Sequence, residues 1–157
     1  MDFTDDELAT WSSLATLLER LPAALDAQLQ HDSGLTHFEY GVLFALDSAP
    51  DRALRLSTLA AYASCTLSRL SRAVTRLHRQ GWVERVVDPT DGRFTLGVLT
   101  DTGHAQVLAA TPGHRALVRR LVFDTIGERE AQHLGAAARA VAEAIGPAPV
   151  WAPGRPT

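Results

Sequence analysis

Apolar residues recur every three or four positions over long stretches of this chain, which is the spacing of amphipathic helices. The first stretch predicts a helix from Asp5 to about Gln30, with Thr4 as its N-cap. Pro22 is expected to kink or divide this helix, because proline lacks the N–H that a helical hydrogen bond needs. The apolar stripe consists of Leu8, Trp11, Leu14, Ala15, Leu18, Leu21, Leu25 and Leu29. Because this stripe exceeds what a small domain covers, we expect part of it to be buried against a partner.

A second helix is predicted after a loop over residues 31–34. Thr36 and Glu39 have the three-residue spacing of a capping box, in which the two side chains satisfy each other's backbone N–H groups. The core face of this helix is formed by Phe38, Val42, Leu43 and Leu46. A further loop over 48–54 then leads to a very short strand at 55–56.

Two closely spaced helices follow this strand. Ser57 is expected to cap the first, and Gly81, which tolerates a positive φ, is expected to end the second, at about 67–80. The apolar stripe of the second helix consists of Leu67, Leu70, Val74 and Leu77, and its other face carries Arg69, Arg72, Arg76 and Arg79. The second helix therefore combines a buried face with an arginine-lined face.

Two β-rich runs, 82–87 and 94–99, come directly after the arginine helix. Residues 88–92 join them and are dense in turn-forming residues. Helix, turn, helix and hairpin in this order is the plan of a winged helix-turn-helix. A helix of this width fits the major groove of B-DNA, and a hairpin tip carrying Arg93 can reach a minor groove.

The remainder of the chain is predicted to be helical up to a tail. Thr111-Pro112-Gly113 should kink or split the first helix, and Gly127 should separate the last one. The predicted elements are a helix over 102–110 capped by Thr100 or Asp101, its continuation over 114–125, a last helix over 128–145, and a flexible tail over 147–157.

The composition limits the classes of function that we expect of the chain. The chain has no run of about 18 apolar residues, so no membrane partner is expected. Its acidic N-terminus differs from the basic start of a signal peptide, and the single Cys65 excludes an internal disulfide; both fit a cytoplasmic protein. No nucleophile–base pair, glycine-rich phosphate loop or pair of carboxylates has a useful spacing, so neither enzymatic activity nor a cofactor is expected.

The charge is distributed unevenly along the chain. The net charge is −3, and all 15 basic residues are arginine. Residues 1–51 hold ten acids and one arginine, whereas residues 52–93 hold eight arginines and three acids. A basic middle within an acidic chain is the electrostatic footprint expected for binding a polyanion.

The stretch Asp91-Gly92-Arg93-Phe94-Thr95-Leu96-Gly97-Val98-Leu99-Thr100 resembles the wing signature of the MarR family of bacterial transcriptional regulators. Residues 68–77 and 81–85 resemble that family's recognition helix and its exit into the wing. The resemblance implies a homodimer, in which residues 1–34 and 101–146 form a helical dimerisation region and residues 35–100 form the winged helix-turn-helix. It also implies a pseudo-palindromic double-stranded DNA operator, repression of nearby genes, and release by a small-molecule effector in some members.

The candidate DNA contacts on the recognition helix follow from position and chemistry. Ser68, Arg69 and Arg72 lie in its N-terminal half, which usually meets base edges. Arginine bonds guanine bidentately, so one of the two arginines is expected to read a base directly. The remaining expectations are phosphate contacts by Ser64, Thr66 and Arg76, and an Arg79 that points away or pairs with an acid.

The candidate contacts on the wing are Arg85, Asp91 and Arg93. The narrow minor groove has a negative potential that favours a guanidinium, which makes Arg93 the expected minor-groove residue. Asp91 is expected to accept hydrogen bonds from Arg93 and to fix its direction; the alternative is a plain surface ion pair, which contributes little to stability. Arg85 is expected to reach a phosphate or to brace the wing.

Other interpretations stay open at this point. Cys65 is predicted to be a buried, inert thiol. His31, Asp32 and His37 form a weak alternative metal cluster, although no metal site is predicted. An effector pocket between the dimerisation helices and the winged domain could be lined by Trp11, His37, Phe38 and Tyr40. The alternative function is a helical protein-interaction module whose winged helix does not bind DNA.

Overall fold

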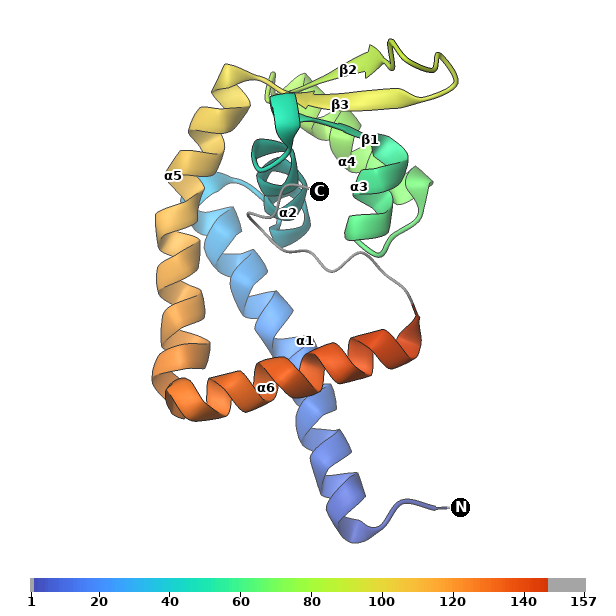
Figure 1. The fold of residues 1–157 in the computed structure, drawn as a ribbon. Coiled ribbons are helices and arrows are strands. Elements are labelled where there is room, and N and C mark those ends of the chain that lie inside the picture. The colour runs from blue at the N-terminus through green and yellow to red at the C-terminus, as the bar shows by residue number, and fades with distance from the viewer. Residues whose placement is uncertain (1, 147–157) are drawn as a thin grey trace.

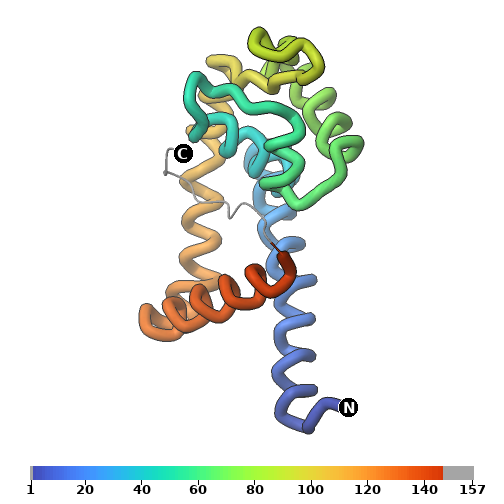
Figure 2. Tube along the Cα trace, turned by 45° about the vertical axis from the view of Figure 1, so that its right-hand side comes forward, coloured from blue at the N-terminus to red at the C-terminus, as the bar shows by residue number. Residues whose placement is uncertain are grey.

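The computed structural model describes residues 2–146, which form a small winged unit and long helices that extend from it (Figure 1). We call α1 (Asp5–Ser33), α5 (Asp101–Val118), η2 (Arg119–Phe123) and α6 (Asp124–Ile145) the helical arms. α6 crosses at the end of α5 that is far from the hairpin (Figures 1 and 2). This mainly helical fold with a hairpin confirms the predicted winged helix-turn-helix. The elements are α1 Asp5–Ser33, α2 His37–Asp47, η1 Pro50–Arg52, β1 Ala53–Arg55, α3 Leu56–Tyr62, α4 Leu67–Arg79, β2 Val83–Val87, β3 Thr95–Leu99, α5 Asp101–Val118, η2 Arg119–Phe123 and α6 Asp124–Ile145.

The sheet is antiparallel, with the strand order β1-β3-β2. Gly97 lies at its centre, opposite Leu54 on β1 and Arg85 on β2. A Cβ at this position would lie 3.4 Å from a methyl group of Leu56, so the glycine lets α3 pack directly on the sheet. The short strand, predicted at 55–56, is Ala53–Arg55. It ends before Leu56 because this buried residue already begins α3.

The core lies where α2, α3, α4 and the sheet meet the end of α1 and the start of α5. Leu70, Val74 and Leu77 are fully buried, as predicted for α4. Leu67 is not: its side chain is 53% exposed, because it occupies the first position of α4, ahead of the turns that pack inward. The buried members of the cluster are Leu29, Leu35, Tyr40, Val42, Leu43, Leu46, Leu56, Leu59, Ala60, Leu70, Val74, Leu77, Val83, Leu99, Val107 and Ala110.

Local capping signals identify most helix starts. The predicted capping box of Thr36 with Glu39 is present at the start of α2, and the predicted N-cap Thr4 forms a second capping box with Glu7 at the start of α1. The predicted cap by Ser57 is wrong, because α3 already begins at Leu56 and its N-cap residue, Arg55, makes no side-chain capping hydrogen bond. Gly81, with φ 76°, follows the end of α4 as predicted.

α1 and α5 are longer than the sequence predicts, because each continues through its internal proline. α1 contains Pro22 without a break and ends at Ser33, where Gly34 with φ 66° is the C-cap. Of the predicted kink or division at Pro22 the division is therefore wrong, and so is the predicted loop over 31–34. One missing N–H removes a single bond from the hydrogen-bond ladder, and the remaining bonds keep 29 residues in one helix.

α5 starts at the N-cap Thr100 and runs through Pro112 and Gly113, so the predicted split at this point is also wrong. A Cβ on Gly113 would lie 3.0 Å from Nε2 of Gln28 in α1. The glycine therefore serves the close packing of α5 on α1, and this packing keeps the helix continuous. The predicted break at Gly127 is confirmed: its φ of 80° and ψ of 171° are not helical and interrupt α6 three residues after its start at Asp124.

The helical arms expose many large apolar side chains. No residue of α6 is buried, although the helix carries apolar residues such as Leu134, Val141 and Ile145. The exposed large apolar residues of the arms are Leu8, Trp11, Leu17, Leu18, Leu108, Leu121, Phe123, Leu134, Val141 and Ile145. The domain limits at 34/35 and 100/101 remain predictions, and the predicted tail over 147–157 lies outside the described residues.

Two histidines meet where α5 packs against α2. The rings of His37 and His114 are 5.5 Å apart, and Tyr40 lies 4.7 Å from the His114 ring on the other side. Burial lowers the pKa of His37, and the nearby Asp26 opposes this effect only in part. Burial and the positive charge of a protonated His37 lower the pKa of His114. Neutral imidazoles are therefore favoured at this joint in the folded chain.

We expect the thermal stability of the chain to fall as the pH drops below about 6.5, the ordinary pKa of histidine. In this range the unfolded chain binds protons that the folded chain does not, so protonation favours unfolding. Melting temperatures at pH 7.5 and 5.5 measure the effect. A variant with both His37→Gln and His114→Gln should show a smaller difference, whereas the exposed His133→Gln control should behave like wild type. An equal pH dependence in all three proteins would contradict this assignment.

Candidate nucleic-acid interface

The recognition helix α4 presents an open groove on the side away from the core. Thr66 caps it by accepting a hydrogen bond from the Arg69 N–H at 3.3 Å, which leaves the hydroxyl hydrogen free to donate. Ser64 precedes the cap in a left-handed conformation, with φ 46°. We call the surface lined by Leu67, Ser68, Ser71, Arg72, Thr75, Arg76 and Arg79 the α4 groove.

The arginines of α4 differ in their surroundings. The guanidinium of Arg69 lies 4.7 Å from the centre of the Phe38 ring on α2, in a cation–π contact. Within residues 2–146, Arg72 and Arg79 form neither an ion pair nor a side-chain hydrogen bond. Arg72 is therefore the better placed of the two predicted base readers. Arg79 lines the α4 groove without an acidic partner among the described residues, so the predicted alternative of pairing with an acid is wrong.

Glu39 joins α4 to α2. Its carboxylate is buried, and one oxygen accepts hydrogen bonds from the N–H and hydroxyl of Thr36 at 2.9 and 2.7 Å. The other oxygen accepts a hydrogen bond from Nε of Arg76. The side chain of Arg76 is 59% exposed, so its terminal nitrogens remain accessible while Nε is held. One carboxylate thus caps α2 and fixes the orientation of α4.

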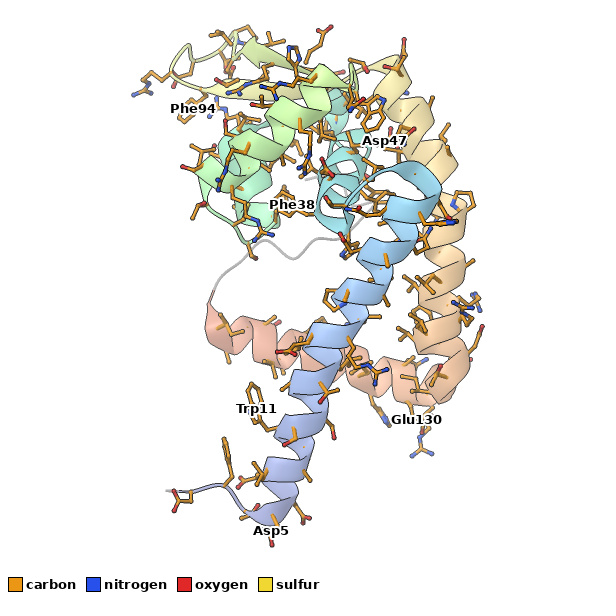
Figure 3. The ribbon with its side chains drawn as sticks, turned by 180° about the vertical axis from the view of Figure 1, so that it is seen from behind. Asp5, Trp11, Phe38, Asp47, Phe94 and Glu130 are labelled. Atoms are coloured by element: carbon orange, nitrogen blue, oxygen red, sulfur yellow. The ribbon has the colours of Figure 1, made fainter. Side chains whose placement is uncertain are left out.

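The hairpin turn is held by a buried carboxylate. Asp88 accepts hydrogen bonds from the N–H and hydroxyl of Thr90 at 2.8 and 2.6 Å, and from Nε of Arg55 at 2.7 Å. The hydrogen bonds from Thr90, followed by those from Arg55, lower the pKa of Asp88 to about 2. The Arg55 guanidinium also lies 4.4 Å from the centre of the Phe94 ring, at the hairpin in Figure 3. These contacts fix the turn on β1, and sequence analysis missed the Asp88–Arg55 pair.

Arg93 stands at the hairpin tip and is paired as predicted. Asp91 receives two parallel hydrogen bonds from its guanidinium, Nε to Oδ1 at 2.9 Å and Nη2 to Oδ2 at 2.6 Å. The hydrogen bonds from Arg93 lower the pKa of Asp91, and the carboxylate raises the pKa of Arg93. The Arg93 side chain is 84% exposed. Asp91 therefore sets the direction of a guanidinium that remains open to solvent.

Arg85 connects the wing to the recognition helix. Its Nη1 donates hydrogen bonds to the hydroxyls of Thr75 at 3.2 Å and Ser71 at 3.4 Å. This is the bracing role that the sequence suggested. Ser71 and Thr75, which complete the brace, were not among the predicted site residues, because their role depends on the packing of the hairpin against α4.

A cavity of about 540 Å³ opens between α1, α2, α3 and the start of α4. Of the predicted lining residues, His37 and Phe38 contribute to it. Trp11 does not, since it lies exposed toward the N-terminal end of α1, far from Phe38 (Figure 3). Tyr40 does not either, because it faces α5 and its hydroxyl lies 3.1 Å from that of Thr111. Arg69 lines the cavity as well, so the cavity adjoins the recognition helix.

The remaining candidates form no reactive centre in the described part of the chain. Cys65 packs against the core but is only partly buried, so it is more accessible than the buried thiol predicted. His31 contacts Asp32 at 2.7 Å, whereas His37 contacts His114, so the alternative metal cluster does not assemble. Residues 2–146 contain no group of three metal-ligating side chains. No helix in this range is long and apolar enough to span a membrane.

Comparisons with known proteins show which family has this sequence and fold. A family model described as MarR family matches residues 33–93. The chain is 41% identical to Sco3205, a MarR family transcriptional regulator from Streptomyces coelicolor solved in complex with DNA; the match covers 93% of this chain and 95% of that one, with a TM-score of 0.90. AbsC, a MarR family transcriptional regulator from the same organism, is 30% identical over 92% and 97% of the two chains, with a TM-score of 0.88.

A third solved structure is PcaV, a transcriptional regulator from Streptomyces coelicolor in complex with its natural ligand. It is 28% identical to the chain over 92% of this chain and 99% of that one, with a TM-score of 0.73. No curated protein sequence matches the chain. The similarity to Sco3205 and AbsC extends over nearly the whole of each chain, helical arms included.

Proposed function

The chain belongs to the MarR family of transcriptional regulators, and we propose that it is a homodimeric repressor that binds a pseudo-palindromic double-stranded DNA operator. The observation that carries this proposal is the placement of two open guanidiniums. Arg72 lies unpaired in the α4 groove, and Arg93 is aimed from the neighbouring hairpin by Asp91. Sco3205, which shares this fold, was solved with DNA bound.

The proposed docking places α4 in the major groove and the wing, residues 88–93, in the adjacent minor groove. Arg72 reads a base edge, and Ser64, Thr66, Ser68 and the free nitrogens of Arg76 contact phosphates or bases nearby. The helix N-terminus adds unpaired amides that favour phosphate. The Arg85 brace holds the hairpin at a fixed distance from α4, so the two grooves are engaged together.

A second copy of the chain is the proposed partner of the helical arms. Exposed leucine, valine and isoleucine side chains along α1, α5 and α6 leave more apolar surface than a monomer usually shows. Burial of this surface against the same surface of another copy gives a two-fold dimer. Such a dimer presents two recognition helices to two half-sites about one helical turn apart.

A small-molecule effector is proposed for the cavity between α1 and the winged unit. PcaV, a relative, was solved with its natural ligand. In this chain the cavity has a mainly apolar lining with Asp26, His37 and Arg69 at its walls. The apolar lining suits a small aromatic compound, and the Arg69 guanidinium suits an acidic group on it. Because Arg69 belongs to α4, occupancy of the cavity would act directly on the recognition helix.

The test of the proposed function separates base reading from anchoring. After operator selection from random duplexes, Arg72→Ala should lose about 1–3 kcal/mol of binding free energy and relax the preference at one base position. Arg76→Ala should weaken binding to all sequences alike. It should also reduce the slope of log K against log salt concentration by about one for each lost phosphate contact. Affinity measured by fluorescence anisotropy at several salt concentrations distinguishes the two effects.

Arg69→Ala is the matched control, because it removes the same positive charge from α4 but at a side chain whose guanidinium lies over the Phe38 ring. We expect it to change base preference less than Arg72→Ala. Equal behaviour of all three variants would contradict the assigned roles. Failure to recover any preferred duplex, together with binding to no DNA at low salt, would favour the alternative of a helical protein-interaction module.

A further inference from the structure

Leu67 is an apolar side chain in an otherwise polar groove. It occupies the first position of α4, is 53% exposed, and lines the α4 groove beside Ser68 and Ser71. The other members of this groove are hydroxyl-bearing or guanidinium side chains. A leucine here contributes nothing to the core, which α4 contacts through Leu70 and its helical neighbours.

Exposed large apolar residues in the described winged unit are confined to the elements proposed to meet DNA. Apart from Phe3 and the helical arms, they are Leu67 on the recognition helix and Val86 and Val87 on the wing strand. Val86 and Val87 lie on the outer strand of the sheet, whereas Leu67 lies at the N-terminal end of the helix, which enters the major groove deepest. Leu67 is therefore the apolar residue placed to meet base edges.

The major groove offers one apolar feature to such a side chain. Guanine, cytosine and adenine present hydrogen-bonding groups there, and thymine adds its C5-methyl group. An arginine-rich groove attracts a polyanion such as DNA and is poorly matched to an apolar protein surface. We propose that Leu67 is a specificity-determining residue that recognises the methyl group of one thymine in each operator half-site.

This proposal rests on the proposed function, so its test begins with an operator selected by the wild-type chain. Each thymine of both half-sites is then replaced, one symmetric pair at a time, by deoxyuridine, which lacks only the methyl group and pairs unchanged. At one pair of positions we expect an affinity loss of about four-fold for each half-site, or about fifteen-fold in total, from burial of one methyl group. Leu67→Ala should bind the thymine and deoxyuridine duplexes with equal affinity at this pair of positions.

Leu67→Met is the matched control, because it keeps an apolar side chain of similar volume and should keep the sensitivity to deoxyuridine. Ser68→Ala, at the neighbouring position, should also keep it. Since Leu67 is exposed, the melting temperature of Leu67→Ala should match that of wild type. The proposal is overturned if no deoxyuridine position loses its effect in Leu67→Ala while the operator itself is bound specifically. Absence of any selected operator would instead refute the proposed function.

Discussion

Insertion of 5 bp between the two half-sites of the selected operator is expected to reduce the affinity of the chain to its level on unrelated DNA. Specific sites are typically bound 10³-fold or more tightly than non-specific ones, so a loss of about this size should be measured. The reason is geometric: in the proposed dimer the helical arms fix the two α4 grooves relative to each other, and 5 bp turns one half-site to the opposite side of the duplex. Anisotropy titrations with both duplexes at one salt concentration test this.

Substitutions that disrupt the proposed dimer should weaken DNA binding in the same way as the 5-bp insertion. Leu18→Glu or Val141→Glu places a charge on an exposed apolar position of the helical arms, at 60% and 55% exposure, and should yield monomers with weak DNA binding. The control on the same helix is Arg139→Gln, which changes charge at an exposed polar position of α6 and should remain dimeric. Sedimentation reports the oligomeric state. A well-folded wild-type monomer at micromolar concentration, or binding that survives the insertion, would contradict the rigid dimer.

Local signals explain which parts of the fold could be predicted from the sequence. Both capping boxes depend on two residues three positions apart, and the end of α4 depends on one glycine. The pairing of Asp91 with Arg93 spans two positions, so its geometry is also set locally. Such contacts are determined by the nearest neighbours in the chain and hardly depend on tertiary packing.

Contacts between distant segments account for what sequence analysis missed. Glu39 and Arg76 are 37 positions apart, and Arg55 and Asp88 are 33 apart, so no pattern of spacing connects either pair. The continuity of α5 through Pro112 likewise depends on its packing against α1, which helix propensity does not contain. Leu67 fits the helical period of the buried stripe, but its place at the start of α4 leaves it in solvent.

Arg93→Ala is expected to weaken operator binding severely while leaving folding and dimerisation nearly unchanged. The side chain is 84% exposed, so its removal costs the folded chain little. Two guanidinium N–H groups are engaged with Asp91, and the remaining three can donate to the acceptors on the floor of a minor groove. Because the proposed dimer carries two wings, the loss counts twice, and we expect affinity to fall by roughly one to three orders of magnitude.

Asp91→Ala should weaken binding less than Arg93→Ala, because Asp91 acts by directing the guanidinium and a carboxylate near phosphates is itself repelled. The double variant should bind about as weakly as Arg93→Ala alone, since residues that act as one unit show non-additive effects. Operator affinities of the wild type, both single variants and the double variant complete the cycle, with melting temperatures as the check on folding. Fully additive losses would give Asp91 a role independent of Arg93. Unchanged binding by Arg93→Ala would remove this guanidinium from the DNA-binding surface and would contradict the proposed minor-groove contact.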